Sequence, residues 1–347
     1  MNGDAQIHVR IVLAFSFQLS GVSVCLVTDS PILFQLCLEY FRYYNPVQTN
    51  PSNQFQIKIK LLLREEHSLE ISKPAKPVAR IGVVELRRYE KRLHQWFYYR
   101  TDNALFRIKP DAGYAVGIVN IKALELPNLL INTYLFSVLL LLLRYQNIFH
   151  LHAAAIISPA KKTYLICGAQ RAGKSTLTAA FGVAGWHPIS DDGILLRPSA
   201  DGSAQFEAFK REFHVSTELL KKWEGLHGLT SRHDYFDRSC IDGLNYFSSL
   251  KLSNQVYQKF ESVIFPMISG KEKSALESIS PSEALQKMIG QSMYFPLGIS
   301  RTKQHFELLS KLCDGTKFYR FLSGKDVWDD PVNLLPICEE LSRTHRT

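Results

Sequence analysis

Cysteine is scarce in this chain, and its spacing excludes the usual roles of the residue. The 347 residues contain six cysteines, too few for a disulfide scaffold. No two of them are separated by two residues, so the zinc and redox motifs built on a C-x-x-C pair are absent. They are Cys25, Cys37, Cys167, Cys240, Cys313 and Cys338. We expect buried, small hydrophobic thiols and a reducing, cytoplasmic location.

A hydrophobic run of membrane-spanning length is also missing. The main apolar stretch, residues 129–143 (LLINTYLFSVLLLLL), has 15 residues, whereas a spanning helix needs about 20. Asn132 and Thr133 interrupt it further. Residues 11–17 (IVLAFSF) are apolar, but only Arg10 closely precedes them and no small-residue cleavage site follows, as a signal peptide requires. The sequence therefore predicts a buried core helix over 129–143 and no membrane partner.

The composition is that of a folded, somewhat basic protein. Hydrophobic residues make up 46% and charged residues 21% of the chain, which excludes a disordered or collagen-like protein. Lys and Arg number 41 against 32 Asp and Glu, a net charge of +9. This excess favours anionic partners without identifying them.

The first third of the chain contains mostly short strand patterns. Residues 7–27 indicate one or two strands turning at Ser20-Gly21, and Pro31, after Asp29-Ser30, begins a helix over 31–44. Further strands are predicted at 55–63 and, in one antiparallel sheet, near 80–86, 94–100, 104–109 and 113–120. We therefore predict an accessory mixed α/β domain over residues 1–125 and a catalytic domain over 126–347.

After the predicted helix over 129–143, the second domain continues with the order strand, loop, helix, strand. Strands are predicted at 150–157 and 162–168, a helix at 174–184, and a short strand ending at His187–Asp192. This order is typical of a nucleotide-binding α/β core. Later helices are predicted at 216–226, 281–293, 301–313 and 331–343, and strands within 258–268 and at 317–322.

A phosphate-loop motif carries the chemistry of this domain. Residues 168–176 (GAQRAGKST) fit G-x-x-x-x-G-K-[ST], after a strand pattern and before a helix, as such a loop requires. Gly168 and Gly173 let backbone N–H groups turn toward phosphate oxygens, and the helix N-terminus adds its positive dipole end. The alternative is a glycine-rich turn that caps an ordinary helix.

Three residues at the end of the motif have specific expected roles toward ATP and Mg²⁺. Lys174 supplies a cation for the β- and γ-phosphates, Ser175 a hydroxyl ligand for Mg²⁺, and Thr176 a contact near the α-phosphate. The expected nucleotide-binding residues are Gly168, Ala169, Gln170, Arg171, Ala172, Gly173, Lys174, Ser175 and Thr176. Arg171 is either a phosphate contact or a solvated side chain.

Two carboxylates and a histidine complete the predicted site. Asp191 and Asp192 follow Lys174 by 17 and 18 residues, at the end of the next strand. One of them can hold Mg²⁺ and the other can remove a proton from an attacking hydroxyl; the alternative is a solvated Asp-Asp-Gly turn. His152, in the strand before the loop strand, either packs in the core or faces the transferred group.

Other charged groups give weaker signals. Arg211 and Arg301 can contact an anionic substrate, although solvated surface positions are favoured. Residues 87–100 mix basic and aromatic residues, but no nucleic-acid fold signature accompanies them, so no nucleic-acid partner is expected. Asp329-Asp330 is most simply the cap of a helix.

Three segments resemble the catalytic domain of the HPr kinase/phosphorylase family and its relatives, which include kinases of lasso-peptide precursors. They are LHAAAI at 151–156, YLICGAQRAGKSTL at 164–177 and AGWHPISDDGILL at 184–196. The resemblance implies an α/β (α+β) fold, with a P-loop kinase core of the phosphoenolpyruvate carboxykinase/HPr kinase type and a smaller β-rich N-terminal domain. It also implies a kinase that uses ATP and Mg²⁺ to phosphorylate a serine hydroxyl.

The resemblance assigns roles to individual residues. Asp191 would be the catalytic base and Asp192 a metal ligand together with Ser175, although the two aspartates can exchange roles. Lys174 would contact the nucleotide, and His152 would lie close to the transferred phosphoryl group. The expected acceptor is a serine in a peptide or small protein; a free, serine-like metabolite and a non-catalytic ATP-binding regulator are the alternatives.

One family segment is missing. HPr kinases carry E-[IV]-R-G-x-G after the acidic pair, tied to the reverse phosphorolysis reaction, whereas residues 205–215 (QFEAFKREFHV) replace it here. The resemblance therefore does not extend to the family's hexamer or to its bifunctional behaviour, and HPr itself is not the expected substrate. A homo-oligomer of another kind stays open.

Overall fold

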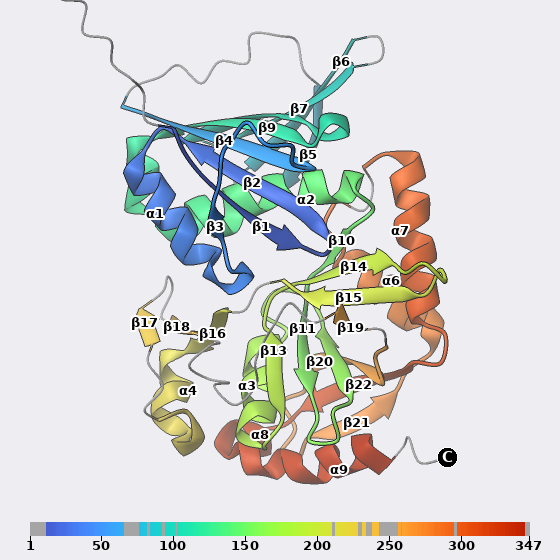
Figure 1. Ribbon diagram of the computed structural model, residues 1–347. Coiled ribbons are helices and arrows are strands. Elements are labelled where there is room, and N and C mark those ends of the chain that lie inside the picture. Colours follow the sequence, from blue (N-terminus) through green and yellow to red (C-terminus); the bar gives the residue numbers. More distant parts are fainter. Residues whose placement is uncertain are drawn as a thin grey trace, which may run out of the picture. The chain divides into compact units, whose positions relative to one another are not determined.

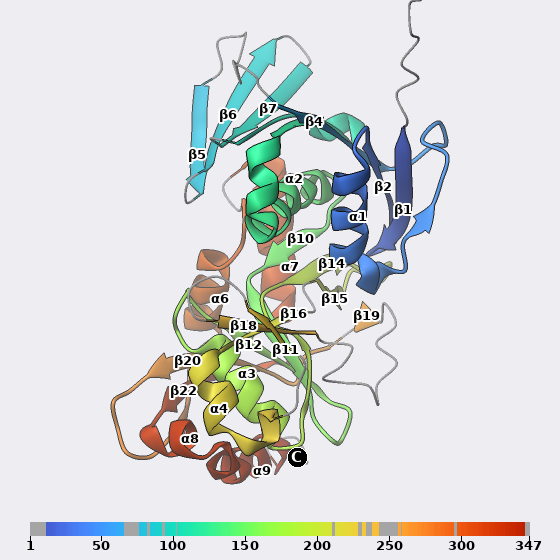
Figure 2. The ribbon, with the colours of Figure 1, turned by 90° about the vertical axis from the view of Figure 1, so that its left-hand side faces the viewer.

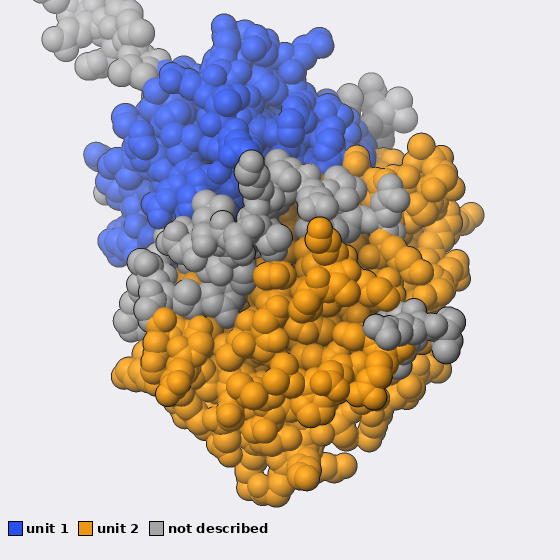
Figure 3. Space-filling view, turned by 60° about the horizontal axis from the view of Figure 1, so that its bottom comes forward, with its two compact units in different colours: residues 1–146 blue, residues 147–347 orange. Residues whose placement is uncertain are grey.

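The computed structural model divides the chain into two compact units, residues 1–146 and 147–347 (Figure 3). It describes residues 12–65, 76–81, 84–91, 94–101, 103–209, 212–227, 231–233, 238–242, 256–257, 259–294 and 297–343. Both units mix helices and strands, as the predicted mixed α/β class requires. The units divide after Gln146 rather than at the predicted 125/126, because the apolar helix that follows residue 128 packs on strand β8 of the first unit.

A nine-stranded sheet forms the framework of the first unit (Figures 1 and 2). Its order is β3-β1-β2-β4-β9-β8-β7-β6-β5. The strands are β1 (Leu13–Leu19), β2 (Val22–Thr28), β3 (Val47–Gln48), β4 (Ile57–Arg64), β5 (Lys76–Ile81), β6 (Val84–Lys91), β7 (His94–Arg100), β8 (Ala104–Lys109) and β9 (Tyr114–Asn120). Strands β5 to β9 are antiparallel to one another, as predicted for this region, although the single strand predicted near 80–86 is divided between β5 and β6. Strand β4 pairs in parallel with both β2 and β9.

The start of this unit follows the sequence signals closely. Ser20 and Gly21 adopt positive φ angles of 49° and 78°, the backbone that a two-residue hairpin turn needs, and they join β1 to β2 as predicted. The Ser30 hydroxyl accepts a hydrogen bond from the Leu33 N–H at 3.3 Å, and Pro31 occupies the first turn of helix α1 (Pro31–Tyr40). The helix is thus capped as its sequence predicts.

The apolar run after residue 128 forms two helical segments rather than one. A π-helix, η4 (Leu129–Leu135), leads into α2 (Phe136–Tyr145). Every residue of α2 from Phe136 to Arg144 is buried, so the predicted core helix is confirmed. Within the described residues, no helix combines the length and the apolar character needed to cross a membrane.

A glycine in β9 makes room for an aromatic ring. Gly117 pairs directly with Phe106 of β8, and a Cβ added to Gly117 would lie 2.4 Å from the Phe106 ring. Phe106 is fully buried, so it has little freedom to withdraw. We expect Gly117→Ala to destabilise the first unit by about 1–3 kcal/mol through overpacking, measured as a lower urea midpoint of the full chain.

A matched glycine separates this effect from a general loss of backbone freedom. Gly290 ends a helix of the second unit, and a Cβ added there meets no atom within 4 Å. We therefore expect Gly290→Ala to leave the midpoint unchanged or to raise it slightly. An unchanged midpoint for Gly117→Ala would contradict the overpacking argument.

The second unit is built on a mixed six-stranded sheet of order β13-β11-β12-β20-β22-β21. Strands β12, β20 and β22 run parallel, and the other neighbours are antiparallel. The strands are β11 (Ala153–Ile157), β12 (Thr163–Cys167), β13 (His187–Ser190), β20 (Ser262–Ile268), β21 (Ala275–Ser278) and β22 (Lys317–Ser323). The predicted strands at 162–168, 187–192, 258–268 and 317–322 are confirmed within one or a few residues.

The second unit also contains two smaller sheets. The first has the order β10-β14-β15-β19 and the second β16-β18-β17. Their strands are β10 (Phe149–Leu151), β14 (Ile194–Pro198), β15 (Ala204–Ala208), β16 (Glu212–Ser216), β17 (Ser231–His233), β18 (Arg238–Asp242) and β19 (Val256–Tyr257). The helices of this unit are α3 (Lys174–Val183), α4 (Thr217–Lys222), α6 (Pro281–Gly290), α7 (Ile299–Leu312), α8 (Lys325–Asp329) and α9 (Leu335–Arg343).

Short 3-10 turns complete the two units. They are η1 (Arg42–Tyr44), η2 (Pro110–Ala112), η3 (Ile121–Glu125), η5 (Glu224–Leu226) and η6 (Pro331–Leu334). The predicted helices at 216–226 and 331–343 each divide into an α-helix and one of these turns. The Asp330 carboxylate accepts a hydrogen bond from the Val332 N–H at 3.0 Å, so the predicted cap at this acidic pair is confirmed.

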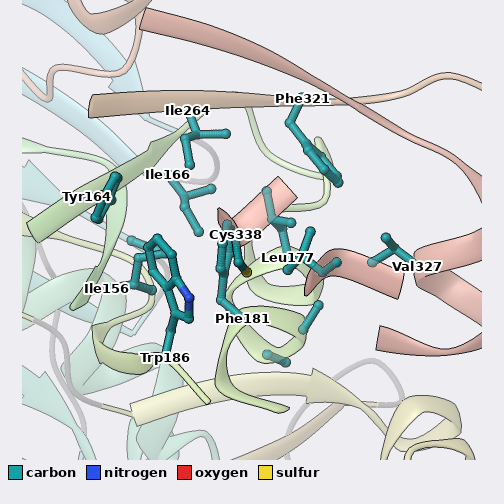
Figure 4. Close-up of a cluster of buried hydrophobic side chains, with 14 of the residues drawn as sticks. Ile156, Tyr164, Ile166, Leu177, Phe181, Trp186, Ile264, Phe321, Val327 and Cys338 are labelled. Carbon is teal, nitrogen blue, oxygen red and sulfur yellow. The ribbon is translucent and has the colours of Figure 1, made fainter. Parts of the chain in front are cut away.

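The six-stranded sheet has a separate core on each face, because strand side chains alternate. Tyr164 and Ile166 of β12 belong to the core that includes α3, α8 and α9, whereas Leu165 and Cys167 belong to the core that includes α6 and α7. In the first core (Figure 4), Trp186 packs on Tyr164 with ring centroids 4.7 Å apart. Strand β12 therefore packs against a hydrophobic core on each face, and the loop that begins at Gly168 leaves from the end of this buried strand.

Candidate active site

Three predicted site segments meet at one end of the six-stranded sheet. Cys167, at the end of β12, pairs with Ala153, the first residue of β11. Ala155 of β11 pairs with Ser190, the last residue of β13. His152, the loop that begins at Gly168 and the pair Asp191-Asp192 therefore emerge side by side, from strands that are far apart in the sequence.

The loop between β12 and α3 contains two residues with a left-handed backbone. Arg171 and Gly173 adopt positive φ angles of 66° and 95°, and helix α3 begins at Lys174 with Gly173 as its N-cap. The first N–H groups of a helix lack intrahelical partners and carry the positive end of its dipole. All nine predicted nucleotide-binding residues lie in this loop and the first turn of α3.

Lys174 lies across the loop. Its Nζ donates hydrogen bonds to the carbonyl oxygens of Gly168 at 2.9 Å and Ala169 at 3.2 Å. The residue is only 6% exposed, although its charge would ordinarily keep it in water. The ammonium group is thus held at the centre of the turn, where a phosphate bound by the loop would meet it.

Asp191 is a buried carboxylate beside the start of α3. It is 2% exposed, and its Oδ2 accepts a hydrogen bond from the His214 N–H at 3.1 Å. Burial raises the pKa of the Asp191 carboxyl, while the neighbouring His214 and a hydrogen bond from Ser175 oppose the rise. Its buried Oδ1 accepts no hydrogen bond from the described residues.

A small cavity adjoins this carboxylate, with room for roughly one water molecule. Ser175 and Asp191 both line it, although they come from different elements. The lining residues are Ser175, Ala179, Pro188, Asp191, Phe213, His214, Val215 and Ile241. The surface of the cavity is mainly apolar, and the cavity brings Ser175, in the first turn of α3, next to Asp191, at the end of β13.

Asp192 has a different environment from its neighbour. Its side chain is 38% exposed, and its Oδ1 lies 2.5 Å from Nε2 of His152, which is 27% exposed. The two side chains are thus within hydrogen-bond distance. The second carboxylate is therefore accessible and oriented by an imidazole, whereas Asp191 is enclosed.

The sequence predicts that His152 lies within a strand, but in the structure it does not. The predicted strand over 150–157 is divided into β10 and β11, which belong to different sheets, and His152 is the single residue between them. Its N–H donates to the Gln291 carbonyl oxygen at 3.0 Å, outside either ladder. Leaving the ladder at this point frees the imidazole to reach Asp192.

The turn after the acidic pair is tightly packed. The Ser190 hydroxyl donates to the Gly193 carbonyl oxygen at 2.6 Å. A Cβ added to Gly193 would lie 2.7 Å from Nε2 of His150. The Asp-Asp-Gly segment is therefore a defined structure at the end of β13, and not a loosely solvated turn.

The remaining predicted residues lie elsewhere or outside the description. Arg171 is exposed at the tip of the loop. Arg301 lies on α7 and donates a hydrogen bond to the Asn147 side chain. Arg211 lies outside the described residues.

The sequence analysis did not identify His214, whose backbone N–H bonds to Asp191. It also did not identify the group of three possible metal ligands to which His214 belongs, Glu212, His214 and Cys240. The only signal was the spacing of Glu212 and His214, two apart in an apolar strand, which places both side chains on one face. Cys240 lies too far along the chain for any spacing to reveal it.

Among known proteins, solved structures gave matches, and these are distant in sequence. No family model and no curated protein matches the chain. Among solved structures, the chain is similar to the Hpr(Ser) kinase/phosphatase from Coxiella burnetii, with 14% sequence identity and a TM-score of 0.27. The match covers 56% of this chain and 98% of that one.

Proposed function

We propose that this chain is a kinase that transfers the γ-phosphoryl group of ATP to a serine-type hydroxyl of a peptide or small protein. One observation carries the proposal: the Lys174 loop and the accessible Asp192–His152 pair lie at the same end of one sheet. Phosphoryl transfer needs mainly positioning and charge neutralisation together with a group that orients the attacking hydroxyl. The Lys174 loop would bind and neutralise the phosphates, and the Asp192–His152 pair would orient the attacking hydroxyl.

The loop is the proposed nucleotide site. Its backbone N–H groups and the N-terminus of α3 would bind the phosphates, and Lys174 would exchange its two carbonyl partners for phosphate oxygens. The loop leaves from the end of the buried strand β12. This anchored end reduces the binding free energy that is lost to ordering the loop.

Ser175 and Asp191 are the proposed ligands of Mg²⁺. Both line the small cavity, and the buried Oδ1 of Asp191 lacks a hydrogen-bond partner among the described residues, as expected of an oxygen that receives a cation. When bound, the ion neutralises charge on the phosphates. The raised pKa of Asp191 fits this role, because a cation there would restore the ionised form.

Asp192 is the proposed base, which exchanges the two roles that the family resemblance assigns to the aspartates. A base must reach the hydroxyl of an acceptor, and the Asp192 side chain is 38% exposed whereas that of Asp191 is 3% exposed. His152 would orient the Asp192 carboxylate and share the proton that it receives.

An acceptor panel tests the proposed function. We expect γ-labelled ATP and Mg²⁺ to label serine-containing peptides or small proteins, and not the same peptides with alanine in place of serine. Labelling of free serine or other small alcohols alone would identify a metabolite kinase instead. Calorimetric binding of ATP without transfer to any acceptor would indicate a regulatory protein, which the missing family segment also allows.

A further inference from the structure

Two strands of the three-stranded sheet β16-β18-β17 bring three different metal-binding side chains together. His214 of β16 pairs directly with Cys240 of β18. Glu212 lies two residues before His214, so its side chain falls on the same face of β16. One donor atom from each of the three lies within 4.8 Å of the other two, close to the spacing of ligands around a single ion.

These donors are partly or wholly enclosed. Cys240 is 4% exposed, Glu212 is 8% exposed, and the side chain of His214 is 21% exposed. Enclosure of this kind limits the access of water to an ion held by the three donors.

The backbone of His214 is also held from outside the group. Its backbone N–H donates to Oδ2 of Asp191 at 3.1 Å, whereas its ring Nδ1 lies 3.9 Å from the same oxygen, too far for a hydrogen bond. Histidines that bind a metal through one ring nitrogen usually present the other to a carboxylate or carbonyl. Asp191 is the carboxylate beside this ring, and a small movement of the ring would bring the two into contact.

We propose that Glu212, His214 and Cys240 form a binding site for a zinc-like transition metal ion, distinct from the proposed Mg²⁺ ligands. A thiolate, an imidazole and a carboxylate are the donor types that Zn²⁺ takes, whereas Mg²⁺ prefers oxygen alone. Three protein ligands leave a fourth position for water or another group. The ion would tie β16 to β18 and hold His214 against Asp191, so it would stabilise one wall of the small cavity.

Cobalt provides a direct readout, because Co²⁺ replaces Zn²⁺ and reports its ligands by absorption. We expect the metal-free, full-length chain to bind about one Co²⁺, with a thiolate-to-cobalt charge-transfer band in the near ultraviolet. Zn²⁺ should remove the band and Mg²⁺ should not. Cys240→Ser should abolish the band and weaken Zn²⁺ binding by roughly 100-fold or more in competition with a chromogenic chelator.

A second cysteine is the matched control. Cys313, at the end of α7, is partly exposed and lies outside the group, so Cys313→Ser should keep both the band and the affinity. Burial raises the pKa of Cys37, Cys167 and Cys338 to about 12 each, which keeps these thiols protonated and makes them poor competitors.

The proposal is overturned if the unmodified chain gives no charge-transfer band, if Cys240→Ser retains it, or if Cys313→Ser removes it. Should Cys240→Ser fail to fold, Glu212→Gln decides the matter. It should keep the thiolate band but weaken Zn²⁺ binding at least about tenfold; unchanged affinity would exclude Glu212 as a ligand and with it the site as proposed. These readouts do not depend on kinase activity, so they stand or fall separately from the proposed function.

Discussion

Replacing Lys174 with alanine is expected to reduce phosphoryl transfer by about a thousandfold or more, the largest catalytic effect that we predict for any residue of this chain. The Nζ group lies at the centre of the loop on two carbonyl oxygens, and no other described residue of the loop except the exposed Arg171 carries a positive charge. Its loss would leave the charge that develops on the transferred group without its cation.

The measurement is single-turnover transfer from γ-labelled ATP, with ATP binding followed separately by calorimetry. Helix α3 should survive the substitution, because Thr178 bonds the backbone oxygen of Lys174 rather than its side chain, and the far-ultraviolet circular dichroism would verify this. Lys303→Ala is the matched control: this lysine is 78% exposed on α7, and its removal should change nothing. Full transfer by Lys174→Ala would refute the loop as the phosphate site.

Asp192→Asn is expected to lower turnover by about 10²- to 10⁴-fold, the range of a lost general base, with the affinity for ATP nearly unchanged. The amide keeps the shape of the side chain and can still bond His152, but it cannot take up the hydroxyl proton. The size of the loss therefore isolates proton transfer from positioning.

Asp191→Asn provides the comparison that separates the two carboxylates. If Asp191 and Ser175 hold the metal, this variant should need a much higher Mg²⁺ concentration for the same rate, whereas Asp192→Asn should keep the Mg²⁺ dependence of the unmodified chain. The opposite pattern, with Asp192→Asn shifting the Mg²⁺ requirement, would return the two residues to the roles that the family resemblance assigns.

Local signals predicted the parts of the structure that depend on a few adjacent residues. The Ser20-Gly21 turn, the Ser30 cap and the strand–loop–helix order around Lys174 all follow from backbone preferences that act within a few positions. The chain order also placed Asp191 and Asp192 at the end of β13, although their different exposure could not be predicted from it.

Features that depend on pairing between distant segments could not be predicted in this way. The run HLHAAAII reads as one strand because its residues suit a strand throughout, and only the partners β14 and β12 divide it at His152. The meeting of Glu212 and His214 with Cys240 likewise depends on the register of β16 and β18. Strand β4 pairs in parallel with β2 and β9. The alternation of apolar and polar residues predicts a strand but does not say whether its neighbours run parallel or antiparallel to it.

The division of the chain at His152 has a counterpart at Asp192. Strand β10 belongs to one sheet and β11 to another, and Asp192 lies between β13 and β14, which belong to the same two sheets. The contact between Nε2 of His152 and Oδ1 of Asp192 therefore joins the two places where the chain crosses between the six-stranded and the four-stranded sheet. The imidazole that orients the carboxylate is thus held by both sheets at once.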